Sequence, residues 1–481
     1  LGMSSTAAEA AERIDEGASR PSLLYRALRA TVRAAVRTFY GRVEVTGLEH
    51  LNPRVPTILA CNHPNSIVDP LLLGTFEPRQ VAFCARDGLF KIPVFGGVLR
   101  AVGAIPIRRK MDKGTSAVDN EGAFSACHDV LARGGVMAIF PEGKTHGNLR
   151  IEPLKTGTAR IAVGAEAAHP GLGIRIVPVG ITYLVRHAFR SDVHVAFGEP
   201  IVVERTPPET EPERAAEVER ENVHALTGRI GDALRDLAVH IEKNEDERLI
   251  AQVTAIIVGI RSEQGLDEKG QSPAERTALV RRVIDAYKWL AEADPERTAQ
   301  LRARLDAYME EREDLGLGGE KPALQHRGER QLLAGRARLA FLIAGAPFAL
   351  FGLATSLAPY VLMRFVMRPL GLSTDRIALF KLLGGATLFG AAYAIEAAFV
   401  TRAFGVLAGS LFGAALVPAA LFARRYVIET RLHRLQLRSV RAFREKRRLE
   451  ALRAERKALA AELAELRTQY LDRIAEKGYA P

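Results

Sequence analysis

Short apolar runs that end in polar residues recur between residues 57 and 181. Thr57 to Cys61 is the first such run, and later runs end at Ile107, Ile139 and Ile181. Runs of about five apolar residues bounded by proline, glycine or polar turns are typical of buried strands. The pattern therefore predicts buried strands with polar side chains at their exits.

A basic amphipathic helix is predicted from Ser22 to Tyr40. At about 100° per residue, four arginines share one side of this helix and apolar side chains occupy the other. The arginines are Arg26, Arg29, Arg33 and Arg37, and the apolar side carries Leu24, Leu28, Val32, Ala35 and Phe39. Such a helix is either an interfacial anchor on anionic lipid or a helix packed on the neighbouring domain. Residues 1–21, rich in Ala, Ser and Glu, are expected to be flexible.

Residues 206–335 are predicted to form a charged helical region. A Pro/Glu-rich breaker starts at Arg205, and residues 213–312 then follow a helical period. Breaks fall near Gln264-Gly265, Lys269-Gly270 and Asp294-Pro295. The pattern indicates several packed helices, for which a lid, a regulatory surface and a spacer all fit.

Two apolar stretches predict membrane segments within residues 336–423. Leu339 to Val361 is nearly uncharged, and Leu382 to Phe422 is apolar apart from Glu396 and Arg402. Because about 20 apolar residues span a bilayer, the longer stretch is split near Thr401-Arg402. Three hydrophobic segments result.

Basic residues favour the cytoplasmic side for both ends of this membrane region. Cationic side chains crowd before the first segment, between the first and second, and after the third, whereas only Arg402 lies between the second and third. By the positive-inside rule, the first segment, which carries Pro347 and Pro359, is then a re-entrant or interfacial hairpin, and the last two form a spanning pair. Three true spans are the alternative. The N-terminal domain is expected on the cytoplasmic face of the inner (cell) membrane.

The tail, residues 424–481, is predicted to be a long charged helix as far as Lys477. Its apolar positions alternate three and four residues apart, the spacing of a coiled-coil seam, with one interruption at Arg456. The seam residues are Leu452, Leu459, Leu463, Leu466 and Tyr470. The seam supports either a homodimer or a single helix lying against the N-terminal domain.

Composition points to an anionic partner and to no metal. The chain has 481 residues and a formal net charge of +11. It shows no helix-turn-helix, finger or aromatic-interleaved basic motif, so an anionic phospholipid membrane is favoured over nucleic acid. The three cysteines, Cys61, Cys84 and Cys127, are scattered without metal-site spacing, which suits a reduced, cytosol-facing compartment.

His63 and Asp69, at the exit of the first predicted strand, are the candidate catalytic pair. Imidazole titrates near neutrality, and a neighbouring carboxylate can fix its tautomer, so that it can take a proton from a hydroxyl. The alternative is structural, because Asp69 directly before Pro70 is also a good N-cap for a helix.

Other predicted strands also end in candidate ligands. Arg108 and Arg109 suit bidentate recognition of phosphate, or are solvated charges at a strand end. Glu142, Gly143 and Lys144 form a turn after the next strand, where the alternatives are a turn carboxylate and a surface lysine.

The order and intervals of these segments resemble the glycerolipid acyltransferase family over roughly residues 40–205. The segments are Asn62-His63-Pro64-Asn65-Ser66-Ile67-Val68-Asp69-Pro70, Gly103–Arg109, Ala138–Thr145 and Ile176–Ile181. Most of the family has four residues between the histidine and the aspartate, whereas five separate His63 from Asp69. The longer form resembles the branch that includes fungal glycerol-3-phosphate and dihydroxyacetone-phosphate acyltransferases.

The resemblance implies an α/β domain over residues 41–205, with a mixed, largely parallel sheet flanked by helices. It implies that His63, oriented by Asp69, acts as general base in acyl transfer from acyl-CoA or acyl carrier protein to glycerol 3-phosphate, without a cofactor. Substrate would be bound by Asn62, Asn65, Arg108, Arg109, Glu142, Gly143 and Lys144. Two alternatives stay open, an enzyme that acylates lysophosphatidate and a non-catalytic membrane-binding or membrane-shaping protein.

Overall fold

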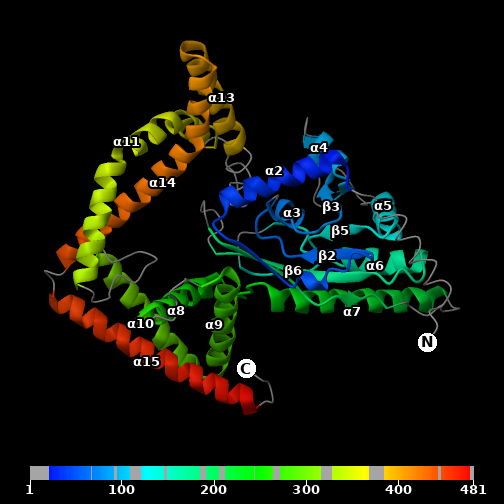
Figure 1. The fold of residues 1–481 in the computed structure, drawn as a ribbon. Helices are drawn as coiled ribbons and strands as arrows, with labels where there is room; N and C mark the ends of the chain where they lie inside the picture. The colour runs from blue at the N-terminus through cyan, green and yellow to red at the C-terminus, as the bar shows by residue number, and fades with distance from the viewer. Residues whose placement is uncertain are drawn as a thin grey trace. The chain divides into compact units, whose positions relative to one another are not determined.

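A computed structural model describes residues 21–66, 68–91, 95–108, 121–145, 149–184, 191–204, 212–242, 244–263, 271–315, 328–367, 384–442 and 446–476 (Figure 1). The chain divides into two compact units. The first comprises Leu1–Glu242, Ser272–Thr277 and Ser373–Leu379, and the second comprises Lys243–Gln271, Ala278–Leu372 and Phe380–Pro481. The predicted flexible segment, apart from its last residue, lies outside the described residues.

The first unit is built on one sheet with the strand order β1-β7-β6-β2-β5-β3-β4, and β8 pairs with β6. The strands are β1 (Val43–Thr46), β2 (Thr57–Cys61), β3 (Val81–Arg86), β4 (Ile105–Ile107), β5 (Val136–Ile139), β6 (Arg175–Tyr183), β7 (Val193–Phe197) and β8 (Ile201–Val202). Strands β2 to β6 run parallel, whereas β7 and β8 pair antiparallel with β6. This mixed, largely parallel sheet confirms the predicted fold class and the four predicted strands.

Helices cover both faces of the sheet (Figure 1). They are α2 (Leu23–Phe39), α3 (Val68–Leu73), α4 (Phe95–Ala101), α5 (Glu121–Ala132), α6 (Gly157–Ala168) and α7 (Pro212–Leu237), with short 3-10 turns η1 (Leu48–His50) and η2 (Asp87–Lys91). Parallel strands need crossover connections, so α3 lies on one face while α5 and α6 lie on the other. The carboxyl ends of β2 to β6 consequently meet at one edge, and the polar residues that follow these strands gather there.

Helix α7 belongs to the sheet unit, contrary to the predicted domain boundary after residue 205. Its apolar stripe joins the main core, which β2, β5, β6, α5 and α6 also line; the stripe residues are Val223, Leu226, Ile230 and Leu234. The helix comes so near β6 that a Cβ on Gly180 would lie 2.7 Å from the carbonyl carbon of Leu237. The sequence predicts this segment as charged, although its apolar residues recur at ordinary helical spacing on one side of the helix.

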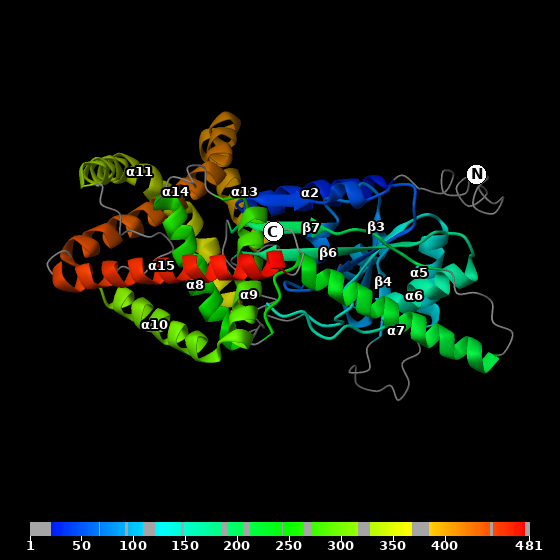
Figure 2. The same cartoon turned by 90° about the horizontal axis from the view of Figure 1, so that it is seen from below.

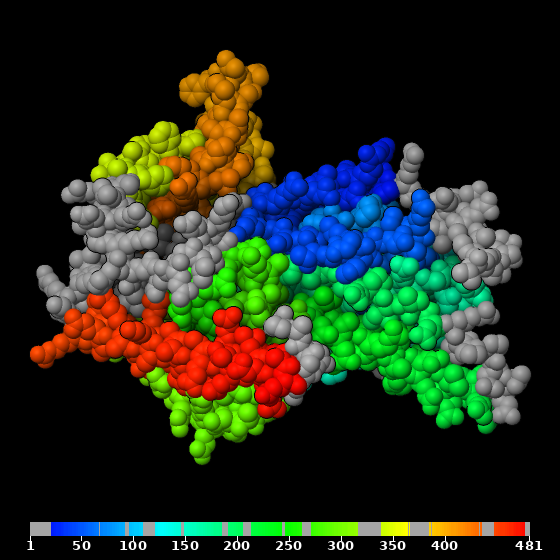
Figure 3. Space-filling model, turned by 60° about the horizontal axis from the view of Figure 1, so that its bottom comes forward, coloured from blue at the N-terminus to red at the C-terminus, as the bar shows by residue number. Residues whose placement is uncertain are grey.

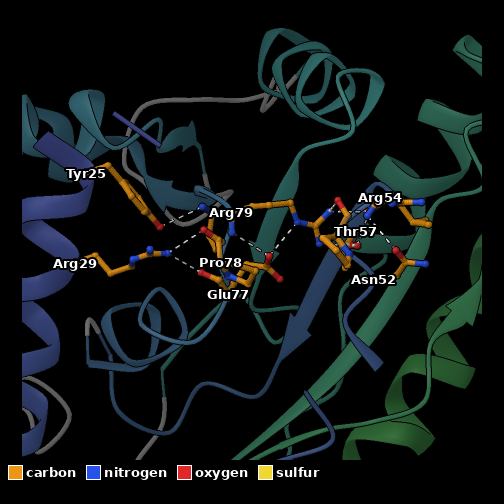
Figure 4. Close-up of polar contacts among 11 residues, drawn as sticks. Tyr25, Arg29, Asn52, Arg54, Thr57, Glu77, Pro78 and Arg79 are labelled. Atoms are coloured by element: carbon orange, nitrogen blue, oxygen red, sulfur yellow. Dashed lines mark hydrogen bonds and ion pairs between the residues drawn. The ribbon is translucent and has the colours of Figure 1, made fainter. Parts of the chain in front are cut away.

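The amphipathic helix α2 packs on this unit, as one of its two interpretations predicts. Tyr25, Val36 and Phe39 are buried. Arg29 donates to the carbonyl oxygens of Glu77 and Pro78, so at least one arginine of the basic side serves the fold (Figure 4). The first turn remains at the surface, where Leu23 is 81% exposed.

The segment on which α2 rests is fastened by a buried ion pair. Arg79 Nε lies 2.9 Å from Glu77 Oε1, and Arg79 Nη1 donates to the carbonyl oxygen of Val55 at 2.8 Å (Figure 4). Glu77 is only 1% exposed, so its carboxylate depends on this partner. The pair ties the connection between α3 and β3 to the residues that precede β2.

The charged region of the second unit contains helices α8 (Asn244–Glu263), α9 (Pro273–Ala293, whose first turn belongs to the first unit) and α10 (Pro295–Asp314). Two helix ends agree with the predicted breaks near Gln264-Gly265 and Asp294-Pro295, because α8 ends at Glu263 and α10 begins directly after Asp294. The predicted break near Lys269-Gly270 lies outside the described residues. The Asp294 carboxylate accepts a hydrogen bond from the backbone N–H of Arg297 at 2.9 Å, which is an N-cap.

Helix α15 (Lys446–Glu476) follows α14 (Val406–Ala442), so the predicted tail helix is two helices. The predicted seam is buried at Leu452, Leu459 and Leu466. It packs within the chain, since α15 contacts α8 and α10 and lies along α10 (Figures 2 and 3). Arg304 of α10 adds ion pairs to Glu455 and Glu462. A seam buried in this way is not available for the homodimer that it suggested.

The apolar region forms α11 (Gly328–Met367), α13 (Gly385–Phe404) and the first part of α14. The turn at Gly405 divides the longer stretch close to the predicted point. The predicted hairpin in the first segment is wrong, because α11 continues through both Pro347 and Pro359. A proline removes one helical hydrogen bond, and where other helices pack alongside, the chain can keep its remaining bonds as a kinked helix.

Two helices of the described residues are long and apolar enough to cross a membrane, over Arg338–Met363 and Val406–Arg431. They pack antiparallel, because Arg338 pairs with Glu429 at 2.7 Å and Gly352 lies against the backbone of Ala419. Large apolar side chains point outward, including Ile343, which is 69% exposed. Such a surface suits lipid better than water, so the pair indicates membrane association.

Candidate active site

The loop after β2 brings His63 and Asp69 into contact. His63 Nδ1 lies 2.9 Å from Asp69 Oδ2, as the sequence predicts. Within this loop Ser66 has a φ of 48°, in the left-handed region. Asp69 lies inside α3, and its carboxylate faces the loop, so the N-cap interpretation is wrong.

Asp69 is fully buried and its two carboxylate oxygens have different partners. Oδ2 accepts from His63 Nδ1 and from the backbone N–H of Asn65 at 2.7 Å. Oδ1 accepts from the hydroxyl of Tyr183 at 2.6 Å. Burial, and then the charge of Asp69, raise the pKa of the Tyr183 phenol well above its usual range, so Tyr183 remains a donor at neutral pH. No sequence motif pointed to Tyr183, which comes from β6.

The His63 ring is held on its other side by Phe140, which follows β5. The two ring centroids are 3.9 Å apart and the planes meet at 22°, a stacked arrangement. Because Nδ1 bonds the carboxylate, Nε2 is the nitrogen that can accept a proton. The His63 side chain is 12% exposed, whereas its aspartate is fully buried. The pair therefore presents one basic nitrogen at the carboxyl edge of the sheet.

Glu142 organises the histidine loop. Oε1 accepts from the backbone N–H of His63 at 2.9 Å, and Oε2 accepts from the backbone N–H of Glu152 at 2.8 Å. The residue is 1% exposed. A buried carboxylate engaged in this way is placed to hold the loop, and its role as a substrate ligand stays a prediction.

Asn62 and Asn65 also serve the framework. The Asn62 amide donates to the carbonyl oxygen of Ile181 at 3.0 Å and accepts from the N–H of the same residue at 2.7 Å. The side chain thus makes the two bonds that the backbone of a neighbouring strand would make. Asn65 is fully buried, and its amide donates to the hydroxyl of Tyr40 at 3.4 Å. Direct substrate contact by Asn62 and Asn65 stays a prediction.

The basic candidates lie at the same edge. Arg108 is exposed and directly follows β4, while Arg109 lies outside the described residues. Lys144 Nζ lies 3.1 Å from Glu152 Oε2. The Lys155 ammonium lies over Gly143, where an added Cβ would be 2.7 Å from Nζ, and Gly143 has a φ of 67° that favours glycine. Lys155 thus joins the candidates for binding an anion.

The cysteines are free, and two of them meet in the structure. Cys84 is hydrogen-bonded to Cys127, and this contact together with burial raises the pKa of the Cys84 thiol. Their distance along the chain gave no sign of this contact. Among the described residues, no group of three or more His, Cys, Asp or Glu side chains is arranged to hold a metal ion.

Residues 42–182 match the family model described as Acyltransferase. This match covers the sheet edge that carries His63, Asp69 and Glu142, so the chain contains a region that matches the Acyltransferase family model. Glycerol-3-phosphate O-acyltransferase 2 of Saccharomyces cerevisiae is 41% identical over 87 residues, which are 18% of this chain and 12% of the yeast protein.

Two further comparisons concern acyltransferases named for another acceptor. The chloroplastic 1-acyl-sn-glycerol-3-phosphate acyltransferase BAT2 of Brassica napus is 30% identical over 174 residues, 35% of this chain and 47% of that protein. The crystal structure of the 1-acyl-sn-glycerophosphate acyltransferase PlsC from Thermotoga maritima aligns with a TM-score of 0.29 and 20% identity, over 43% of this chain and 79% of that chain. The chain spans less than half the length of both curated relatives.

Proposed function

We propose that the protein is a membrane-bound O-acyltransferase that moves a fatty acyl group from acyl-CoA or acyl carrier protein to glycerol 3-phosphate. The observation that carries the proposal is the buried contact between His63 Nδ1 and Asp69, which leaves Nε2 as the base. The similarity to the yeast glycerol-3-phosphate enzyme supports this acceptor. Neither a metal nor a cofactor is needed, because a thioester already has a good leaving group.

In the proposed reaction, His63 Nε2 removes the proton from a glycerol hydroxyl as that oxygen attacks the thioester carbonyl. The tetrahedral intermediate expels the thiolate, which takes the proton back from the imidazolium. Asp69 stabilises the imidazolium between these steps. General-base help of this kind contributes about a hundredfold to ten-thousandfold in rate.

A small acceptor without an acyl chain must be bound mainly through its phosphate. Arg108, Arg109, Lys144 and Lys155 are the proposed partners, each charge-assisted hydrogen bond contributing about 1.5–3 kcal/mol. Lys155 is the strongest of these, because its ammonium lies over the Gly143 turn that also holds the histidine loop.

Arg108→Ala and Lys155→Ala are each expected to raise the acceptor KM about tenfold or more, with the acyl-donor KM within about twofold. Steady-state kinetics with each substrate varied in turn checks this. Arg54→Ala is the matched control, since Arg54 is exposed ahead of β2, at the opposite edge of the sheet. An unchanged acceptor KM in both variants would remove these side chains from the acceptor site.

The acceptor itself is tested with purified enzyme, labelled acyl-CoA, and either glycerol 3-phosphate or lysophosphatidate. A specificity constant higher for glycerol 3-phosphate supports the proposal. A preference for lysophosphatidate would transfer it to the function named for the Brassica relative. No acyl transfer to either acceptor would favour a non-catalytic membrane protein.

We place α11 and α14 across the membrane, with the end that carries Arg338, Arg425 and Arg431 in the cytoplasm. Because the two helices are antiparallel, the sheet unit and α15 then share that side. With the three cysteines replaced, Ala475→Cys should react with an impermeant thiol reagent only after intact cells are permeabilised. Phe404→Cys, at the end of α13 that directly precedes α14, should react without permeabilisation. Labelling of Ala475→Cys in intact cells would instead mean three spans.

A further inference from the structure

Tyr183 ends the central strand β6 next to the histidine loop. Strand β6 pairs with β2 along its length, and Cys61 lies opposite Val179. Strand β6 continues for four residues beyond this pair, so Tyr183 lies past the end of β2. The Asn62 amide fastens the loop to β6 at Ile181, two residues before the tyrosine. The register of the sheet therefore fixes the distance between the phenol and the loop.

The hydroxyl of Tyr183 bonds the one oxygen of Asp69 that the histidine does not use. Its 2.6 Å bond goes to Oδ1, whereas His63 and the Asn65 N–H share Oδ2. A carboxylate can rotate about its Cβ–Cγ bond unless both oxygens are held. With one donor on each side, the Asp69 carboxyl plane is fixed and Oδ2 stays directed at Nδ1.

The other titratable groups around the pair come from three elements. Cys61 lies on β2, Tyr40 follows α2, and Glu142 follows β5. Burial raises the pKa values of Cys61 and Tyr40, so both are neutral near pH 7. Glu142 bonds backbone N–H groups. Among the described residues, the side chains of His63 and Tyr183 are hydrogen-bonded to the carboxylate of Asp69.

We propose that Tyr183 is a positioning residue, which holds Asp69 in the orientation that the His63 base requires and limits how strongly the carboxylate retains the imidazolium proton. This inference deepens the proposed acyl-transfer function and rests on it. A donor on the second oxygen withdraws electron density from the first, which weakens the hydrogen bond between Oδ2 and the imidazolium.

Tyr183→Phe removes the hydroxyl and keeps the ring. The acid limb of the pH profile of kcat/KM should move up by about one pH unit, because an aspartate with one donor fewer binds the imidazolium more strongly. At its optimum, kcat should fall about tenfold, with both KM values within about twofold, because Tyr183 is buried and its hydroxyl bonds Asp69.

Tyr25→Phe is the matched control. Tyr25 is a buried tyrosine of the same unit whose hydroxyl accepts from the N–H of Val81, at the amino end of β3. Its loss should lower stability without moving the pH profile, which separates a positioning role from mere packing. An unmoved profile and unchanged kcat in Tyr183→Phe would overturn the inference.

A second readout does not depend on turnover. Diethyl pyrocarbonate reacts with neutral imidazole, so the pH midpoint for modification of His63, followed by mass spectrometry of its peptide, should also rise in Tyr183→Phe. If the wild-type protein transfers no acyl group to either acceptor, the proposed function fails while this midpoint still decides the contact with Tyr183. A midpoint that does not change refutes the role of Tyr183 whatever the activity.

Discussion

His63→Ala and Asp69→Asn are each expected to lower kcat by about a thousandfold or more while the protein stays folded and membrane-bound. The alanine variant has no base at the sheet edge. The asparagine variant keeps the shape of Asp69, but its amide can turn an N–H toward Nδ1, which forces the proton onto the wrong ring nitrogen. Acyl transfer in membranes, normalised to the amount of protein, measures both effects.

Asp192→Asn provides the matched control for the change of charge. Asp192 is a carboxylate of the same unit that pairs with Arg42 at 2.6 Å, ahead of β7, and the variant should keep nearly full activity. If Asp69→Asn retained more than about a tenth of wild-type activity, Asp69 would not orient the base, because a wrong tautomer costs orders of magnitude.

The contact between His63 and Asp69 could be predicted because it is local. The two residues leave the same strand, and a short loop can return one side chain to the other even with one residue added. The conformation that achieves this, with Ser66 at a φ of 48°, could not be predicted, because serine has no strong preference for it.

The contribution of Tyr183 depends on strand order. It follows Asp69 by 114 residues and approaches it only because β6 pairs directly with β2. A sequence pattern gives the strands but not which of them are neighbours. The same limit hid the contact between Cys84 and Cys127.

The error at the prolines of α11 has a different cause. Pro347 and Pro359 would end most helices in water, where the freed backbone groups find solvent. In the described helix neither proline ends the element, and the packing of α11 against α14 supports it along its length. Local propensity was outweighed by contacts that follow only from the complete fold.

Glu142→Ala and Glu142→Gln are both expected to lower kcat about a hundredfold, with the acceptor KM within about threefold, because Glu142 supports the loop that carries the base. Alanine leaves two buried N–H groups without acceptors, each at a cost of about 1–3 kcal/mol. Glutamine keeps one acceptor and directs an amide N–H at the other donor. Misplacing a base by about 1 Å costs about a hundredfold in rate.

Glu166→Gln supplies the comparison that separates support of the site from support of the fold. Glu166 is 5% exposed, and its carboxylate also accepts from two backbone N–H groups, those of Gly171 and Ile174, after α6. Glu166→Gln should lower the unfolding temperature about as much as Glu142→Gln, because both lose an acceptor in a buried loop, but its kcat should stay near that of the wild type. If Glu142→Gln instead raised the acceptor KM at constant kcat, Glu142 would bind the acceptor directly, as the motif resemblance implies. Its burial and its two backbone bonds argue for the first outcome.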